Sequence, residues 1–117
     1  MELITQAQTQ QLPANSRAQR AAIDQDADAL DFKPVVKLFT PDAQCTWLLT
    51  EIDADGVAFG LCDLGLGEPQ FGYVNLAELV TVSGNLGLPI ERDLHFDADK
   101  PISAYADDAR SHRHIVT

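Results

Sequence analysis

The sequence predicts an α+β fold, with a small antiparallel sheet of four to five strands and short flanking helices. Most of the bulky apolar residues lie in one stretch, residues 35–78. Turn signals such as Pro41-Asp42 and Asp55-Gly56 divide this stretch into runs of strand length. Helix signals lie toward the two ends of the chain. With 117 residues, 45% of them hydrophobic, the chain is long enough for one domain with a modest core.

Two regions are expected within this length. Residues 1–32 are predicted to be an N-terminal arm, helical and partly flexible, because four aspartates crowd residues 24–31 and repel each other. Residues 33–117 are predicted to be a single compact domain. The last residues, 111–117, are expected to form a mobile tail.

The arm is predicted to hold two short helices. The first is expected at Gln6–Leu12 and ends before Pro13, since proline removes a helical hydrogen bond. Asn15 or Ser16 is then expected to cap a second helix, Arg17–Ile23, whose alanines favour helix.

Strand propensity and alternation predict the sheet. The Asp55-Gly56 pair is the strongest hairpin signal in the chain. Asn75 is predicted to cap a short helix at Leu76–Leu79, and Pro101 to open a final helix through about Arg110. The predicted extended segments are Val35–Thr40, Thr46–Ile52, Val57–Leu64, Gln70–Val74 and Pro89–Phe96.

The chain is acidic, with a formal net charge of −10. Residues 41–117 carry thirteen acids and four bases, so almost all of the excess lies beyond the first strand. Nucleic acids and membrane surfaces are themselves anionic, which disfavours direct binding to either. A protein partner with a basic surface is expected instead. The acids expected on turns and outward strand positions are Glu51, Asp53, Asp55, Asp63, Glu68, Glu91 and Asp93.

The two cysteines, Cys45 and Cys62, are too few for a disulfide scaffold. No leader-like segment opens the chain, and no run approaches the length of a membrane span. We therefore expect a cytoplasmic protein in which both thiols are reduced and pack as small hydrophobes. Their spacing does not tell whether they are neighbours.

One constellation has a chemical interpretation. If Pro89–Phe96 were a strand, Glu91, Asp93 and His95 would project from one face. Two carboxylates and an imidazole can hold a divalent metal, which makes a metal-dependent hydrolase the alternative function. No second cluster accompanies them, so neither a metal site nor a cofactor is predicted.

Other catalytic patterns are not met. A nuclease site would need an acid two residues before a catalytic lysine, with another acid on a neighbouring strand. Val35 and Ala98 stand at that position before Lys37 and Lys100. Asp31 does lie two residues before Lys33, but the only acids upstream of it lie in the loop 24–28 and not on a paired strand. The Gly-Leu-Gly at residues 65–67 is followed by Glu-Pro rather than by a helix that would bind phosphate. The sequence therefore predicts no catalytic residues and leans toward a non-enzymatic role.

The order of several short segments resembles that of a small bacterial domain family of unknown function that is carried largely on mobile genetic elements. The segments are Val36–Asp42, Thr46-Trp47, Glu51, Phe59-Gly60, Gly72–Val74, Leu76, Glu78-Leu79, Gly87–Leu94 and Lys100-Pro101. The resemblance implies no transferable activity. Its context implies a role such as antagonism of a nucleic-acid-handling host defence protein, of the anti-CRISPR or anti-restriction type. Together with the charge, it leads us to expect an acidic protein-binding module.

Overall fold

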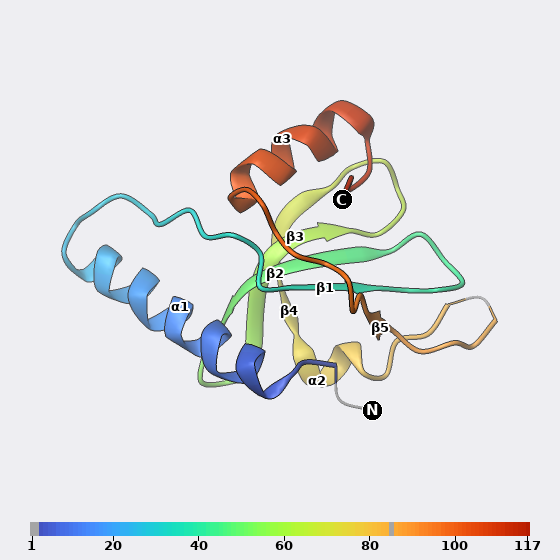
Figure 1. Ribbon diagram of the computed structural model, residues 1–117, viewed down its shortest axis with the longest axis horizontal. Helices are drawn as coiled ribbons and strands as arrows, with labels where there is room; N and C mark the ends of the chain where they lie inside the picture. Colours follow the sequence, from blue (N-terminus) through green and yellow to red (C-terminus); the bar gives the residue numbers. More distant parts are fainter. Residues whose placement is uncertain (1–2, 85) are drawn as a thin grey trace.

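A computed structural model describes residues 3–84 and 86–117 of the chain. The fold is α+β, as the sequence predicts: within these residues, five antiparallel strands form one sheet in the order β4-β3-β2-β1-β5, with three flanking helices (Figure 1). In chain order the elements are α1 (Gln6–Asp24), β1 (Val36–Phe39), β2 (Thr46–Ile52), β3 (Val57–Asp63), β4 (Gln70–Asn75), α2 (Leu76–Leu79), β5 (Glu91–Arg92) and α3 (Ile102–His112).

The hairpin between β2 and β3 forms around Asp53. Its backbone N–H donates to the carbonyl of Val57 at 2.9 Å, and its carboxylate accepts the amides of Asp55 and Val57 at the same distance. Gly56 closes the turn with φ 81°, a conformation that glycine adopts without strain. The Asp55-Gly56 turn is therefore confirmed, as a three-residue loop that ends in a left-handed glycine.

Each face of the sheet has its own core. On the α1 face, Leu12 of α1 packs with Val36, Leu38, Trp47 and Leu49. On the α3 face, Leu48 and Leu61 pack against α3, and the residues that α3 supplies are Ile102, Tyr105, Ala106 and Ala109. Figure 1 shows α3 above the strands and α1 along their lower left side. A strand covered on both sides reads as an apolar run, which explains the sequence of β2.

The N-terminal segment is one helix, so the prediction of two helices separated by Pro13 is wrong. Thr5, not Asn15 or Ser16, is the N-cap, and it exchanges hydrogen bonds with Gln8 in a capping box. A proline in a helix interior costs about 3 kcal/mol. Packing offsets this cost, because Leu12 is fully buried and the buried Asn15 side chain donates to the carbonyl of Thr50 at 2.9 Å.

This hydrogen bond also places α1. Strand β1 pairs with only the first part of β2, up to Leu49, which leaves the rest of β2 without a strand on that side. The helix lies along this free stretch, where a bulge after Leu49 brings Glu51 opposite Phe59. The second half of α1 therefore lies beside the hairpin end of β2 and β3.

The prediction of a long strand at Pro89–Phe96 is also wrong. Only Glu91 and Arg92 pair with β1, and residues 94–95 form a turn. The Asp93 carboxylate accepts the amide of His95 at 2.9 Å, a local bond that competes with extended pairing. The alternation in this segment reflects a short edge strand followed by a turn.

The C-terminal residues after α3 fold back over the α3 face. The helix extends to His112, two residues beyond the predicted end, and Arg113 caps it in the left-handed conformation with φ 64°. The amide of Ile115 then donates to Asp63 at 3.0 Å, and Lys37 donates to the hydroxyl of Thr117 at 2.6 Å. The segment that was expected to be mobile thus has specific contacts with β3 and β1.

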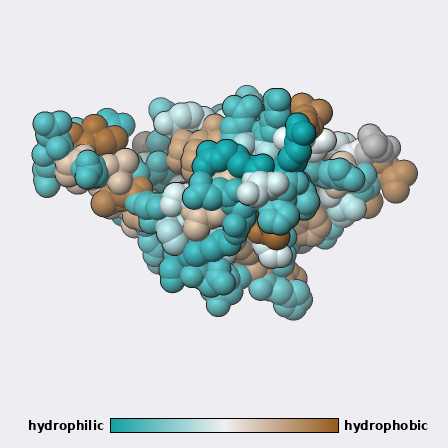
Figure 2. Space-filling model, turned by 90° about the horizontal axis from the view of Figure 1, so that it is seen from above, coloured by the Kyte–Doolittle hydropathy of each residue, from teal (hydrophilic) through white to brown (hydrophobic). Residues whose placement is uncertain are grey.

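Seen from above, the surface is largely hydrophilic, and hydrophobic side chains form small separate areas on it (Figure 2). One such area lies at the end of the molecule where α1 gives way to loop 25–35, which exposes Ile23 and Leu30. Within the described residues, none of the helices combines the length and apolar character required to cross a bilayer.

Candidate partner-binding site

The acids predicted to form a partner-binding face are spread over the molecule. The hairpin end of β2 and β3 carries Glu51, Asp53 and Asp55. The other end of β3 and the loop after it carry Asp63 and Glu68, and β5 and the residue after it carry Glu91 and Asp93. Glu51 and Asp53 line the same small cavity, and Asp55 lies in the turn with Asp53, so the hairpin end carries three of the seven acids.

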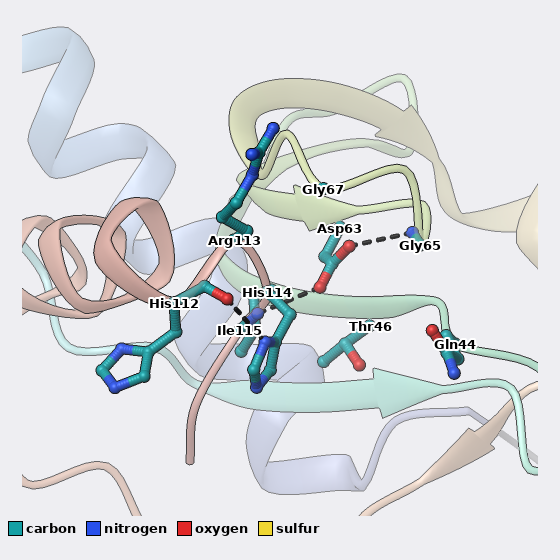
Figure 3. Close-up of a pocket in the computed structure, with 9 residues that line it drawn as sticks. All are labelled: Gln44, Thr46, Asp63, Gly65, Gly67, His112, Arg113, His114 and Ile115. Atoms are coloured by element: carbon teal, nitrogen blue, oxygen red, sulfur yellow. Dashed lines mark hydrogen bonds between the residues drawn. The ribbon is translucent and has the colours of Figure 1, made fainter.

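Asp63 does not face solvent, contrary to the prediction. Its side chain is only 3% exposed, one carboxylate oxygen accepts the amide of Gly65 at 2.9 Å, and the other accepts the amide of Ile115. Figure 3 shows this carboxylate between the β3–β4 loop and the C-terminal segment. Asp63 therefore holds these two segments together and is not a docking residue.

The cavity beside Asp63 has a volume of about 610 Å³. Its basic side chains diverge: Arg113 points up past Gly67, and His112 points away from the loop, whereas His114 lies nearer to Asp63 (Figure 3). The Nδ1 atoms of His112 and His114 each lie within hydrogen-bond distance of a backbone carbonyl. These groups do not converge on a point where a single anion would bind.

Glu91 of β5 and Asp93, which follows this strand, do not form a metal site with His95. Lys37 lies 3.4 Å from the Asp93 carboxylate. The pKa of Asp93 is lowered chiefly by the hydrogen bond from the His95 backbone and further by Lys37. Among the described residues, no group of three histidine, cysteine or acidic side chains is placed to hold a metal ion.

Both cysteines are free thiols on the α1 face, where they pack against the core. Cys62 lies opposite Trp47 in the register of β2 and β3, and burial raises its pKa. A thiol in such surroundings stays protonated, which fits the expected packing role and disfavours a nucleophile.

Three aromatic side chains, those of Phe59, Phe71 and Tyr73, form a partly exposed row on the α3 face. Phe59 of β3 lies 5.1 Å from Tyr73 of β4 and 5.7 Å from Phe71, measured between ring centroids. Tyr73 is 74% exposed and Phe71 is 42% exposed. Helix α3 covers Leu48 and Leu61 but leaves this end of the sheet open.

Glu51 continues this row, because it lies opposite Phe59, which in turn lies opposite Tyr73. Burial raises the pKa of Glu51, and its Oε2 atom is buried without a hydrogen-bond partner among the described residues. The carboxylate lines a cavity of about 160 Å³ together with both rings. The rest of the lining is Ser16, Gln19, Arg20, Ile23, Asp53 and Val57.

The backbone of β4 is open on its outer side. Strand β4 ends the sheet, and the amide of Leu76 donates to the carbonyl of Gly56 at 3.1 Å, toward β3. Backbone groups of successive residues in an antiparallel strand point to alternate sides. Phe71 and Tyr73 lie five and three residues before Leu76, an odd number in each case. Their N–H and C=O groups therefore point to the side opposite to that of Leu76, away from β3. The same two residues supply the exposed rings.

A protein family described as "Protein of unknown function (DUF2958)" matches residues 3–116. The chain belongs to the DUF2958 family. This confirms the predicted membership in a family of unknown function, and the match includes α1 as well as the sheet. The comparisons with curated proteins and with solved structures gave no match.

The sequence indicates some residues of this candidate site but not which of them are exposed. Glu51 and Asp53 were predicted as partner-binding residues. Aromatic side chains such as those of Trp47 and Tyr73 lie in a core more often than at a binding surface, and the sequence does not tell which of the two is exposed. The structure separates them, because Trp47 is buried under α1 and Tyr73 is exposed. Alternation in residues 70–74 puts Phe71 and Tyr73 on one face. Which part of that face a helix covers depends on the length and path of α1 and α3.

Proposed function

We propose that this chain is a protein-binding module whose partner adds an extended, basic segment to the open edge of β4. The observation that carries the proposal is that Phe71 and Tyr73 present both unpaired backbone groups and exposed rings on one uncharged edge strand. Strand addition uses such backbone groups for affinity and neighbouring side chains for specificity. The role is non-enzymatic.

The edge lacks the usual protection against pairing. Natural sheets shield edge strands with charged side chains, proline or a covering element. The six residues of β4, QFGYVN, contain neither charge nor proline. The main elements packed against β4 are β3 and the short helix α2 that continues it. An edge of this kind favours pairing with another strand.

The charges beside β4 favour a basic segment over a second copy of the chain. Glu68 precedes the strand, Glu78 follows it, and Asp55 lies in the turn next to Gly56, whose carbonyl accepts the amide of Leu76. In an antiparallel pair of two copies, the Glu68 end of one strand meets the Glu78 end of the other. Like charges would then meet at both ends, whereas lysine or arginine in a partner would be attracted.

The proposal extends to the type of partner. Nucleic-acid-handling proteins carry basic surfaces because they bind the phosphate backbone. The resemblance to genes of mobile elements makes host defence proteins of this type, such as CRISPR or restriction components, the first partners to test. Binding there would be steered by charge and would weaken as salt rises.

Hydrogen exchange at single amides tests strand addition directly. The probe is a ten-residue peptide that alternates arginine with threonine. We expect the Phe71 and Tyr73 amides to exchange fast in the free protein and to become protected when the peptide binds. The amides of Gly72 and Val74, which point to β3, should change little. A peptide that alternates aspartate with threonine is the control, and it should protect none of them.

A double variant tests the edge independently. Phe71→Lys with Tyr73→Lys introduces the charges that natural edges carry, and we expect at least a tenfold loss of affinity for the arginine peptide with the fold retained. Leu94→Lys makes the same type of change at another exposed residue and should retain most of the affinity. Unchanged affinity in the double variant, or binding without amide protection, would contradict strand addition.

A further inference from the structure

We infer that Glu51, Phe59 and Tyr73 form a recognition site for a single cationic group, an ammonium or a guanidinium. The site runs across β2, β3 and β4 on the α3 face, and Glu51 lies two strands in from the edge. It rests on the proposed function only for the identity of the partner that would supply the cation, because Glu51 and Phe59 lie on inner strands and only Tyr73 belongs to the edge strand.

The cavity is small and its walls come from three directions. Strands β2, β3 and β4 form its floor, the second half of α1 forms one wall, and the turn acid Asp53 lies at its end. Its volume of about 160 Å³ is below the roughly 300–1,000 Å³ of pockets that hold drug-sized ligands. A cavity of this size suits one side chain rather than a cofactor or a nucleotide.

The carboxylate in this cavity lacks a donor. The buried Oε2 atom of Glu51 accepts no hydrogen bond from the described residues. Arg20 lines the same cavity, but the ion pairs found among the described residues do not include Glu51. Buried carboxylates in folded proteins are normally paired or hydrogen-bonded. A cationic group in the cavity would supply the opposite charge that Glu51 lacks among the described residues.

The rings supply the second half of the site. Phe59 and Tyr73 are tilted by 56° to each other at 5.1 Å between centroids, so their faces do not stack fully and remain partly open. Phe71 stacks on Phe59 with an interplanar angle of 9°, which steadies the central ring. A cation within about 6 Å of an aromatic face is attracted by the ring quadrupole. Carboxylate and rings thus favour the same class of ligand.

The cation is not a side chain of the strand added to β4. Neighbouring strands lie about 4.8 Å apart, so an added strand is about 14 Å from β2, beyond the reach of its side chains to Glu51. The cation must come from a segment that crosses the α3 face, or be a free small cation. The edge and the cavity share Tyr73, so a variant at Glu51, which lies on β2, tests the cavity without changing the edge.

Titrations followed by NMR at the Phe59 and Tyr73 rings test the site. The probes are N-acetyl-arginine methylamide, N-acetyl-lysine methylamide and free guanidinium, and the neutral control is N-acetyl-citrulline methylamide, which matches arginine in shape. We expect saturable shifts with the charged probes and none with citrulline. Shifts only with the amino-acid derivatives would indicate a protein side chain as the source, and equal binding of guanidinium would indicate any small cation.

Two matched variants complete the test. Glu51→Gln keeps the shape of the side chain and removes its charge, and we expect it to weaken arginine binding at least tenfold. Glu91→Gln removes the same charge from the exposed strand β5, away from the cavity, and should change binding by less than twofold. Equal effects of the two variants, or equal binding of citrulline and arginine, would overturn the inference. The Phe71 and Tyr73 amides should still be protected by the arginine-threonine peptide in Glu51→Gln, which keeps this result separate from strand addition.

Discussion

At the scale of single residues, two acids have roles opposite to those that charge alone suggests. Asp63 is a structural residue whose carboxylate joins the β3–β4 loop to the C-terminal segment. Glu51 has a buried oxygen without a partner among the described residues. Both lie on strands and both were expected to face outward. The difference arises from segments distant in sequence, since residue 115 covers Asp63 and α1 borders Glu51.

We expect Asp63→Asn to destabilise the fold by about 1–3 kcal/mol, the cost of an unsatisfied buried polar group. Asparagine retains one acceptor, but its NH₂ group would then face a backbone N–H that now donates to Asp63. Urea unfolding measures the change in the free energy of unfolding. Glu68→Gln is the control, because it removes a charge from an exposed loop residue nearby. Equal stability of the two variants would contradict the role assigned to Asp63.

Glu51 should make stability depend on pH. Burial raises its pKa above the ordinary value of 4.5, so between these two pKa values the folded state binds more protons than the unfolded state. Stability from this group is therefore lost as pH rises from 4.5 through the raised pKa, and remains low above it. We expect the free energy of unfolding of Glu51→Gln, relative to the wild type, to increase over this pH range.

Thermal unfolding of both proteins between pH 4 and pH 7 measures this difference, and Glu91→Gln controls for the loss of one negative charge. A difference that stays constant with pH would show that burial does not penalise the Glu51 carboxylate. A stabilised Glu51→Gln variant that no longer binds cations would be a trade of stability for function, as is common at binding sites.

At the scale of elements, the sequence predicted correctly those turns and helix caps that depend on contacts between nearby residues. The Asp53–Gly56 turn and the Asn75 cap of α2 depend on neighbours within four residues, and both were predicted correctly. The error at Pro13 has a different cause, because the packing of Leu12 and Asn15 against the sheet offsets the cost of the proline. Strand β5 is short because the Asp93–His95 turn ends it.

We expect Gly56→Val to destabilise the hairpin by about 1–2 kcal/mol, since its φ of 81° is costly for a β-branched residue. No atom lies within 4 Å of a Cβ added there, so the cost comes from the backbone and not from a clash. Gly56→Asn is the matched control, because asparagine tolerates the left-handed region and should lose less stability. Urea unfolding compares the three proteins, and a Val variant as stable as the Asn variant would contradict this account.

At the scale of the whole molecule, the sequence predicted the α+β class and the strands β1 to β4 with small errors at their ends. The apolar run of β2 indicated that both of its faces are covered. The sequence did not show how α1, α3 and the C-terminal segment share the two faces. The candidate site depends on that division, because the Glu51–Phe59–Tyr73 row is exposed only where α3 stops and α1 passes to one side.

The positions of the seven acids along the strands explain why they do not form one face. In an antiparallel hairpin, the end of the first strand lies beside the start of the second strand. A residue at the end of the first strand is therefore far from a residue at the end of the second. Glu51 and Asp63 are twelve residues apart in a hairpin, at the hairpin end of β2 and the far end of β3. Alternation indicates the face of a residue but not its neighbours along the sheet.

The open edge of β4 has a consequence for how this protein behaves at high concentration. An uncharged, aromatic edge strand is a template on which identical chains can stack into aggregates. The net charge of −10 opposes this, because copies of the chain repel one another before their edges can meet. That repulsion vanishes near the isoelectric point of about 4.4 and is screened by concentrated salt. The repulsion between acidic copies of the chain therefore limits self-association through β4, and the edge stays accessible to the partner that we propose.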